Sequence, residues 1–257
     1  MTDSVENEWL CARIMSGLGF EVAPTEIATF GNTKALVVTR FDRRWQNIAA
    51  GAELKTRFKP PEGAWIARLP QEDFCQALGV APDQKYQSDG GPSVEDCLRV
   101  LAASENADDD RASLALAQLA FWLMAATDGH AKNFSLRHQR GGRFSLTPLY
   151  DVLSAWPIIG DGPNHIAYPR ARLAMAVQGE RNAHYRLRDI PPRHWQRLAA
   201  RCGPGVWDRM RAMVDRVDGV LDALATALPD GFPERTWAPI AAGMRRHARL
   251  FQRGADP

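Results

Sequence analysis

The chain lacks a strong net charge and any apolar run long enough to cross a membrane. Its 32 lysines and arginines nearly balance 30 aspartates and glutamates, so its composition predicts neither a nucleic-acid-coating protein nor an acidic tail. The longest apolar run, residues 114–126, is too short to span a bilayer, and the first residues show no signal-peptide pattern. We therefore expect a cytoplasmic protein without a membrane partner.

Cysteine is also scarce, with four residues that are widely spaced along the chain. They form neither the close pairs of a zinc site nor the dense set of a secreted scaffold, so we expect reduced thiols. What the chain does have is 257 residues, of which 45% are hydrophobic and 24% charged. This is enough for one large domain or for two small lobes with real cores.

The apolar pattern predicts a small sheet followed by a mostly helical body. A helix is expected over 5–18, and the segments 26–30 and 35–39 predict a hairpin around Gly31. Residues 40–45 are expected to leave this sheet, and the polar, proline-interrupted segment 46–63 predicts a long loop.

Helices are predicted to dominate after that loop. One begins near Ser93, and another follows an acidic linker at 108–110 and ends near residue 126. Two long amphipathic helices are expected over 206–228 and 235–252.

The most informative segment is the run 127–133, of sequence TDGHAKN, followed by Asp151. Two carboxylates and an amide at this spacing suit a phosphotransferase that uses Mg²⁺ and ATP. Asp128 would orient a substrate hydroxyl, while Asn133 and Asp151 would share the metal, because Mg²⁺ prefers oxygen ligands. The alternative is an Asx-type turn after a helix, with Asp151 capping the next element.

A second hairpin is predicted to bring these side chains together. The segments 134–136 and 144–146 flank two glycines, Gly141 and Gly142, which favour a tight turn. Such a hairpin would return Tyr150 and Asp151 to a place beside Asp128.

The residue at position 130 indicates which branch of the kinase-like fold the chain resembles. Ordinary protein kinases place a lysine two residues after the catalytic aspartate, whereas this chain has His130, a pattern that resembles the phosphoinositide-kinase and aminoglycoside-kinase branches of the fold. His130 would contact phosphate, or it would hold the shape of the loop through a hydrogen bond. The sequence leaves both alternatives open.

Several further stretches resemble the HipA family of bacterial serine/threonine kinases, and together they cover nearly the whole chain. They are SVENE at 4–8, RFDRRW at 40–45, RLPQED at 68–73, KYQSDGGP at 85–92, the run 127–135 and LTPLYD at 146–151. The resemblance implies an α+β, mostly helical fold of the protein-kinase-like, phosphoinositide-kinase-like type. Residues 1–45 would be a remnant of the N-lobe, with a helix, a hairpin and a hinge, and residues 46–257 would be the helical C-lobe.

The resemblance also implies site residues and cofactors. Asp128 would be the catalytic base, and Asn133 and Asp151 the Mg²⁺ ligands. ATP would meet the hinge at Thr39, Arg40 and Phe41 through its adenine. The remaining nucleotide-binding residues would be His130, Ala131, Lys132 and Tyr150.

HipA proteins are toxins of toxin-antitoxin systems, and a DNA-binding antitoxin, HipB, neutralises them. The resemblance therefore implies a HipB-like antitoxin with its operator DNA, and a protein substrate such as an aminoacyl-tRNA synthetase, since glutamyl-tRNA synthetase is a known type of target. Arg193, Arg197 and Arg201 recur at steps of four and would form a basic helical stripe suited to DNA phosphates. The alternative is a solvated face whose arginine stems cover apolar surface.

The chain departs from the family at its start. In such kinases a Gly-rich loop and a strand lysine precede the helix with the paired glutamate, here Glu8, yet only seven residues precede Glu8 and none is lysine. Most of the ATP-covering lobe is thus expected to be absent. Three interpretations follow: a polypeptide without its upstream half, a lobe completed by a separate chain, or a decayed kinase. We favour the first two, because a decayed kinase need not keep Asp128, Asn133 and Asp151.

Two rival functions stay open at this stage. A small-molecule kinase of the aminoglycoside type would share the His130 pattern, although the matches at 68–73 and 85–92 favour HipA. A catalytically silent module that binds the antitoxin or DNA would keep the fold without phosphoryl transfer.

Overall fold

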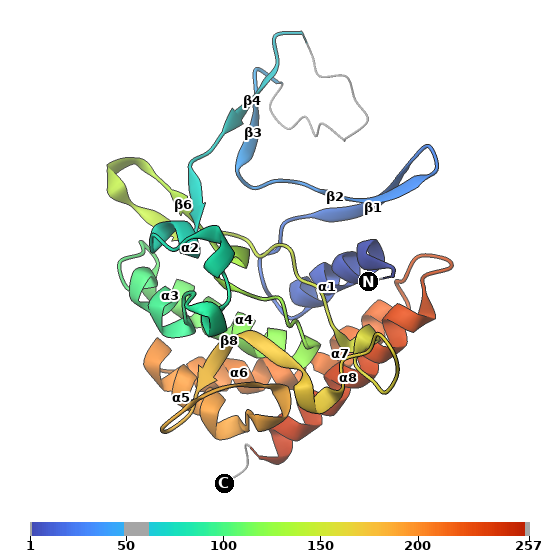
Figure 1. The fold of residues 1–257 in the computed structure, drawn as a ribbon. Coiled ribbons are helices and arrows are strands. Elements are labelled where there is room, and N and C mark those ends of the chain that lie inside the picture. Colours follow the sequence, from blue (N-terminus) through green and yellow to red (C-terminus); the bar gives the residue numbers. More distant parts are fainter. Residues whose placement is uncertain (1, 49–61, 255–257) are drawn as a thin grey trace.

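The computed structural model describes residues 2–48 and 62–254, which form an α+β, mostly helical chain. Two hairpins stand above a helical body, and α1 lies beneath the first hairpin (Figure 1). The α-helices are α1 Ser4–Gly17, α2 Phe74–Ala77, α3 Val94–Leu101, α4 Ala107–Met124, α5 Pro192–Cys202, α6 Val206–Asp215, α7 Val217–Ala225 and α8 Glu234–Arg253. The strands are β1 Thr25–Phe30, β2 Thr33–Val38, β3 Arg43–Gln46, β4 Trp65–Arg68, β5 Gln71–Asp73, β6 Ser135–His138, β7 Phe144–Leu146, β8 Arg172–Gln178 and β9 Ala183–Arg186.

The first helix and hairpin are confirmed. Strands β1 and β2 pair antiparallel from Thr25 opposite Val38 to Phe30 opposite Thr33, so Gly31 and Asn32 alone make the turn. Gly31 has a φ of 60°, which glycine adopts without steric cost.

The path after the first hairpin differs from the prediction. Residues 43–46 form a strand, β3, which pairs antiparallel with β4, so Gln46 does not begin a loop. The rest of the predicted loop over 46–63 falls mainly on residues 49–61, which lie outside the described residues. The sequence signal was missed because a four-residue strand is too short to show a clear alternation.

The core is built around α4. From Leu114 to Met124 every residue of this helix is buried, because α3, α5, α6 and α8 surround it. A helix enclosed on all sides is apolar all round rather than amphipathic, which explains the apolar run, in which Gln118 is the single polar residue. The four cysteines are free and buried, as expected.

The predicted acidic linker at 108–110 is wrong, because these residues already belong to the first turn of α4. Carboxylates are favourable there, since the helix N-terminus carries partial positive charge. The buried carboxylate of Asp110 also accepts hydrogen bonds from the Ser104 hydroxyl and, at 2.9 Å, from the Leu146 amide. The start of α4 is thereby fixed to strand β7.

The predicted helix over 206–228 is also wrong, because the chain bends at Arg216 into α6 and α7. The two halves have different partners: α6 packs on α4 and α8, whereas α7 packs on α1 and α8. Arg216 donates a hydrogen bond to the Leu18 carbonyl at the end of α1. The helices near Ser93 and over 235–252 are confirmed, the former with Ser93 and Asp96 in a capping box.

His247 lies at the centre of the body and supplies a test of the fold. It is fully buried, stacks on Trp122 at 4.2 Å between centroids, and its Nδ1 lies 2.8 Å from the Trp122 carbonyl oxygen. Its Nε2 lies 3.0 Å from the Tyr168 hydroxyl. Burial lowers the pKa of His247 to about 4.

We expect the free energy of unfolding to fall as the pH drops from about 6.5 toward 4, because the unfolded chain then binds a proton that buried His247 excludes. The loss is about 1.4 kcal/mol per pH unit for each such histidine. Urea unfolding of wild type and His247→Gln at pH 7 and pH 5 measures it. The free energy of unfolding of the variant should fall less between pH 7 and pH 5 than that of wild type, by the contribution of one histidine. An equal fall in both proteins would contradict the low pKa of His247.

Candidate active site

The segment 127–133 is presented by the end of α4. Ala125 takes a left-handed conformation with a φ of 49°, which ends the helix, and a short 3₁₀ helix, Ala131–Asn133, follows. The loop lies directly against the core, since a Cβ added to Gly129 would overlap the ring of Phe121. The position of the loop is therefore set by the most buried helix of the protein.

Asn133 and Asp151 meet as the sequence predicts. The Asn133 Nδ2 donates to the Asp151 Oδ2 at 2.7 Å, and the Asn133 Oδ1 accepts from the His130 amide at 3.0 Å. Asn133 is buried, and Asp151 holds a left-handed φ of 57°. The Asn133 amide nitrogen thus faces the Asp151 carboxylate, while the Asn133 amide oxygen faces the His130 backbone amide.

The hairpin of β6 and β7 brings Asp151 to this place. The two strands pair antiparallel, and the Thr147 amide extends the pairing to the Ser135 carbonyl at 2.9 Å. The Tyr150 hydroxyl lies 2.6 Å from the Ser135 hydroxyl and donates to the Lys132 carbonyl at 2.9 Å. Tyr150 therefore ties the hairpin exit to the loop 127–133.

Helix α1 fixes the chain on the far side of Asp151. The buried Asn7 amide donates to the Ser154 carbonyl at 2.8 Å, and its Oδ1 accepts from the Ser154 amide at 2.9 Å. This paired contact joins residues that are 147 positions apart. The segment with Asp151 is thus held at both ends.

Asp128 points outward, with 61% of its side chain exposed. Its Oδ1 accepts a hydrogen bond from the Tyr86 hydroxyl and lies 3.9 Å from the Lys85 Nζ and 3.7 Å from the His130 Nε2. The hydrogen bond raises the pKa of Tyr86 to about 12. An exposed carboxylate with this setting can orient a hydroxyl on a large substrate.

Lys85 and Tyr86 are site residues that the motif analysis missed. The sequence showed them only as part of a family match, because 42 residues separate Tyr86 from Asp128 and no local pattern joins them. Both come from the segment between α2 and α3.

His130 is buried, and its ring meets the Tyr86 ring edge-on at 5.4 Å between centroids. Its backbone amide donates to Asn133, a contact that does not involve the ring and so decides neither alternative, while its Nε2 faces Asp128. Burial lowers the pKa of His130, so a neutral ring is favoured.

A cavity of about 390 Å³ opens beside Asp151 between α1, the hinge segment and Tyr150. Arg40 and Phe41 line it as predicted, and the Phe41 ring lies 5.6 Å from the Tyr150 ring. Thr39 does not line it; its amide donates to the Pro24 carbonyl at 2.8 Å. The other lining residues are Glu8, Ala12, Val22, Ala23, Thr25, Val38, Asp42, Gln71 and Val152.

The remaining predicted nucleotide residues lie next to the cavity without lining it. Ala131 is buried in the 3₁₀ helix, and Lys132 contributes its carbonyl to Tyr150.

Arg40 is held by a bidentate ion pair with Asp42, with nitrogen to oxygen distances of 2.7 and 2.8 Å.

Three carboxylates crowd this site. Burial, and then the charge of Asp128, raise the pKa of Asp151. Burial, and then Asp151, raise the pKa of Glu8 to about 7, and none of the described lysines or arginines pairs with Glu8. A bound cation would relieve this repulsion, and the oxygen atoms of Asn133 and Asp151 are the donor type that Mg²⁺ prefers. Asp151 offers Mg²⁺ a carboxylate oxygen as it stands, and Asn133 would offer its Oδ1 once its amide group is turned over, so the donor set fits a magnesium site.

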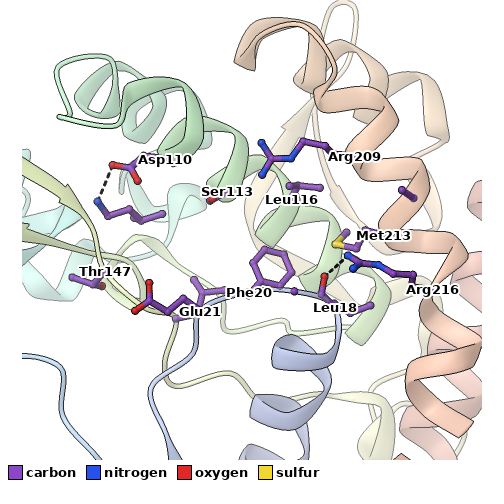
Figure 2. Close-up of a pocket in the computed structure, with 14 residues that line it drawn as sticks. Leu18, Phe20, Glu21, Asp110, Ser113, Leu116, Thr147, Arg209, Met213 and Arg216 are labelled. Atoms are coloured by element: carbon purple, nitrogen blue, oxygen red, sulfur yellow. Dashed lines mark hydrogen bonds between the residues drawn. The ribbon is translucent and has the colours of Figure 1, made fainter. Parts of the chain in front are cut away.

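A second cavity, of about 420 Å³, is lined by residues that include Phe20, Thr147 and Met213 (Figure 2). Arg209 faces it from α6 and Arg216 from the junction of α6 and α7, with Glu21 and Asp110 on other walls. It contains neither Asp128 nor the pair of Asn133 and Asp151, so we do not assign the reaction to it.

The predicted basic stripe is present on α5, where Arg193, Arg197 and Arg201 are all exposed. Two of them already have partners: Arg197 donates to the Gly179 carbonyl at 3.3 Å, and Arg201 pairs with Glu95 at 3.1 Å. Arg193 makes no ion pair with the described residues.

The close fit of Gly129 against Phe121 can be tested. We expect Gly129→Ala to lower the free energy of unfolding by about 1–3 kcal/mol, because the added methyl group overlaps a buried ring. Gly219→Ala in α7 is the matched control, since nothing lies within 4 Å of its added Cβ, and it should stabilise by about 0.5–1 kcal/mol. Urea unfolding of both variants measures these changes, which should have opposite signs. Equal changes in the free energy of unfolding would contradict the close fit of Gly129 against Phe121.

Comparison with known proteins identifies the family to which the chain is similar. The model of the HipA-like C-terminal domain matches residues 1–227. The chain is 32% identical over 229 residues to "Putative kinase Y4mE" of Sinorhizobium fredii, covering 88% of this chain and 48% of that protein. It is 32% identical over 164 residues to the serine/threonine-protein kinase toxin HipA of Shewanella oneidensis, covering 58% of this chain and 34% of that protein. It thus spans half or less of the length of these relatives.

Solved structures agree in fold. HipA of Shewanella oneidensis, solved with HipB and its operator DNA, matches with a TM-score of 0.79 at 22% identity, over 99% of this chain and 57% of that one. The Helicobacter pylori kinase CtkA matches with a TM-score of 0.56 at 10% identity, over 99% of this chain and 86% of that one. The predicted kinase-like α+β fold is confirmed. None of the described helices is long and apolar enough to cross a membrane.

Proposed function

The chain belongs to the HipA-like C-terminal domain family, and we propose that it forms the catalytic part of a serine/threonine protein kinase that transfers the ATP γ-phosphate to a protein serine. The observation that carries this proposal is the contact of Asn133 with Asp151 at 2.7 Å, with Asp128 close enough to raise the pKa of Asp151. The adjoining cavity ends at Asp151, which suits a nucleotide whose phosphates point toward the loop.

In this proposal the adenine occupies the cavity of about 390 Å³, against Phe41 and the backbone of Arg40. The phosphates extend toward Asn133 and Asp151, which would hold Mg²⁺. When bound, Mg²⁺ neutralises charge on the phosphates. The loop residues His130, Ala131 and Lys132 then line the path of the phosphates.

Asp128 has a different task. Its exposed carboxylate orients the serine hydroxyl for in-line attack on the γ-phosphorus and accepts its proton. Phosphoryl transfer needs little covalent chemistry from the protein, so placing the hydroxyl is the main contribution of Asp128. A protein substrate such as an aminoacyl-tRNA synthetase can reach this carboxylate because 61% of the Asp128 side chain is exposed.

We expect Asp128→Asn to reduce phosphate transfer from Mg-ATP to a candidate synthetase by about 10²–10⁴-fold while nucleotide binding persists. Asp151→Asn should instead remove Mg²⁺-dependent binding, because it deletes the only charged ligand of the proposed metal site. Radiolabel transfer and calorimetry separate the two effects. Asp208→Asn, on the exposed face of α6, is the control and should change neither. Full transfer by Asp128→Asn would overturn the proposal.

We propose a HipB-like antitoxin and its operator as partners, because the HipA of Shewanella oneidensis was solved with both. The exposed stripe on α5 is the proposed contact with DNA phosphates, with Arg193 the residue least engaged by the chain itself.

We expect Arg193→Glu to weaken operator binding by the chain with its antitoxin and to reduce the salt slope by about one unit, because one phosphate contact is lost. Arg249→Glu on α8 removes the same charge from another exposed position and is the control. Fluorescence anisotropy at several salt concentrations measures both. Equal affinities and slopes for the two variants would leave the stripe as an ordinary solvated face.

A further inference from the structure

The loop before α3 is built to a defined shape. The Gly91 amide donates to the Tyr86 carbonyl at 2.9 Å, and a Cβ at Gly91 would overlap the carbonyl oxygen of Gln84, so only glycine fits there. Gln87 accepts a hydrogen bond from the Ala176 amide of β8 at 2.7 Å. Lys85 and Tyr86 are therefore held in place from both sides.

These two residues turn toward the catalytic carboxylate. The Tyr86 hydroxyl donates to the Asp128 Oδ1, and the Lys85 Nζ lies 3.9 Å from the same oxygen. The Lys85 ammonium also lies 5.0 Å from the centroid of the Tyr86 ring, within the range of a cation–π interaction. Among the described residues, Lys85 is the one lysine or arginine whose charged group lies within 4 Å of Asp128.

The position of Lys85 favours contact with one phosphate of ATP, the γ-phosphate. A general base must lie within hydrogen-bond reach of the attacking hydroxyl, and that hydroxyl attacks the γ-phosphorus in line. A cation beside Asp128 is therefore close to the γ-phosphoryl group and farther from the α- and β-phosphates. Cations aimed at the transferring group are a main source of catalysis in such reactions.

We infer that Lys85 is a γ-phosphate-binding residue, delivered to the site by a loop outside the segment 127–133 and held there by Tyr86. The inference rests on the proposed kinase function and deepens it. In the absence of nucleotide, Lys85 pairs with Asp128; with Mg-ATP bound, its ammonium donates to the γ-phosphate and offsets the negative charge beside Asp128.

Calorimetry with Mg-AMP-PNP and Mg-ADP tests this role, because the two nucleotides differ at the γ position. We expect Lys85→Met to weaken Mg-AMP-PNP binding by about 10- to 100-fold, the usual range for a charged hydrogen bond, and Mg-ADP binding by less than about 2-fold. Lys85→Arg keeps the charge and should keep most of the preference for Mg-AMP-PNP. Arg245→Met removes a positive charge from α8, where Arg245 pairs with Asp218 and Asp222, and should leave both affinities unchanged.

The outcomes are distinct. Thermal unfolding verifies that Lys85→Met is folded. If the folded variant binds both nucleotides as tightly as wild type, the inference is overturned and the kinase proposal stands. An equal loss of affinity for both nucleotides has the same meaning. An ion pair that merely orients Asp128 would give the first of these results. A wild-type chain that binds neither nucleotide would overturn the kinase proposal and this inference with it.

Discussion

The site depends on the meeting of two separately fixed segments, which is marked by the hydrogen bond from the Asn133 amide to the Asp151 carboxylate. This bond joins segments 18 residues apart, and each segment is fixed by a separate part of the fold. Buried α4 sets the loop with Asn133, whereas the hairpin, Tyr150 and the contact of Asn7 with Ser154 set Asp151. A hydrogen bond to a charged group contributes about 1.5–3 kcal/mol, so it cannot assemble these elements; it reports that they are already in register.

Electrostatics explains why such an arrangement suits a nucleotide and a metal. Glu8 and Asp151 line the cavity, the charge of Asp128 acts on Asp151 from outside it, and the pKa of both Glu8 and Asp151 is raised. Lys85 is a partial counter-charge at the edge of this group, 3.9 Å from Asp128. The site without ligand therefore holds unrelieved repulsion, and a cation between Asn133 and Asp151 would be favoured for that reason.

Local signals in the sequence predicted much of this arrangement. The glycine pair at 141–142 marked the hairpin, and the apolar run before residue 127 marked the buried helix, so the meeting of Asn133 with Asp151 followed. The features that the sequence did not predict depend on tertiary contacts. The bend at Arg216 reflects different packing partners on its two sides, and Tyr86 reaches Asp128 across 42 residues. The roles of the site residues stay predictions.

The connection between α1 and β1 links the cavity to the metal segment. The Leu149 amide donates to the Glu21 carbonyl, and the Leu149 carbonyl accepts from the Ala23 amide, both at 2.9 Å. Val22 and Ala23 of this connection line the cavity of about 390 Å³, while Leu149 precedes Tyr150 and Asp151 by one and two residues. A displacement of Asp151 must therefore strain the wall of the cavity. The cavity and the segment with Asp151 are therefore joined by one pair of backbone hydrogen bonds, so the proposed adenine site and the proposed metal site rest on the same connection.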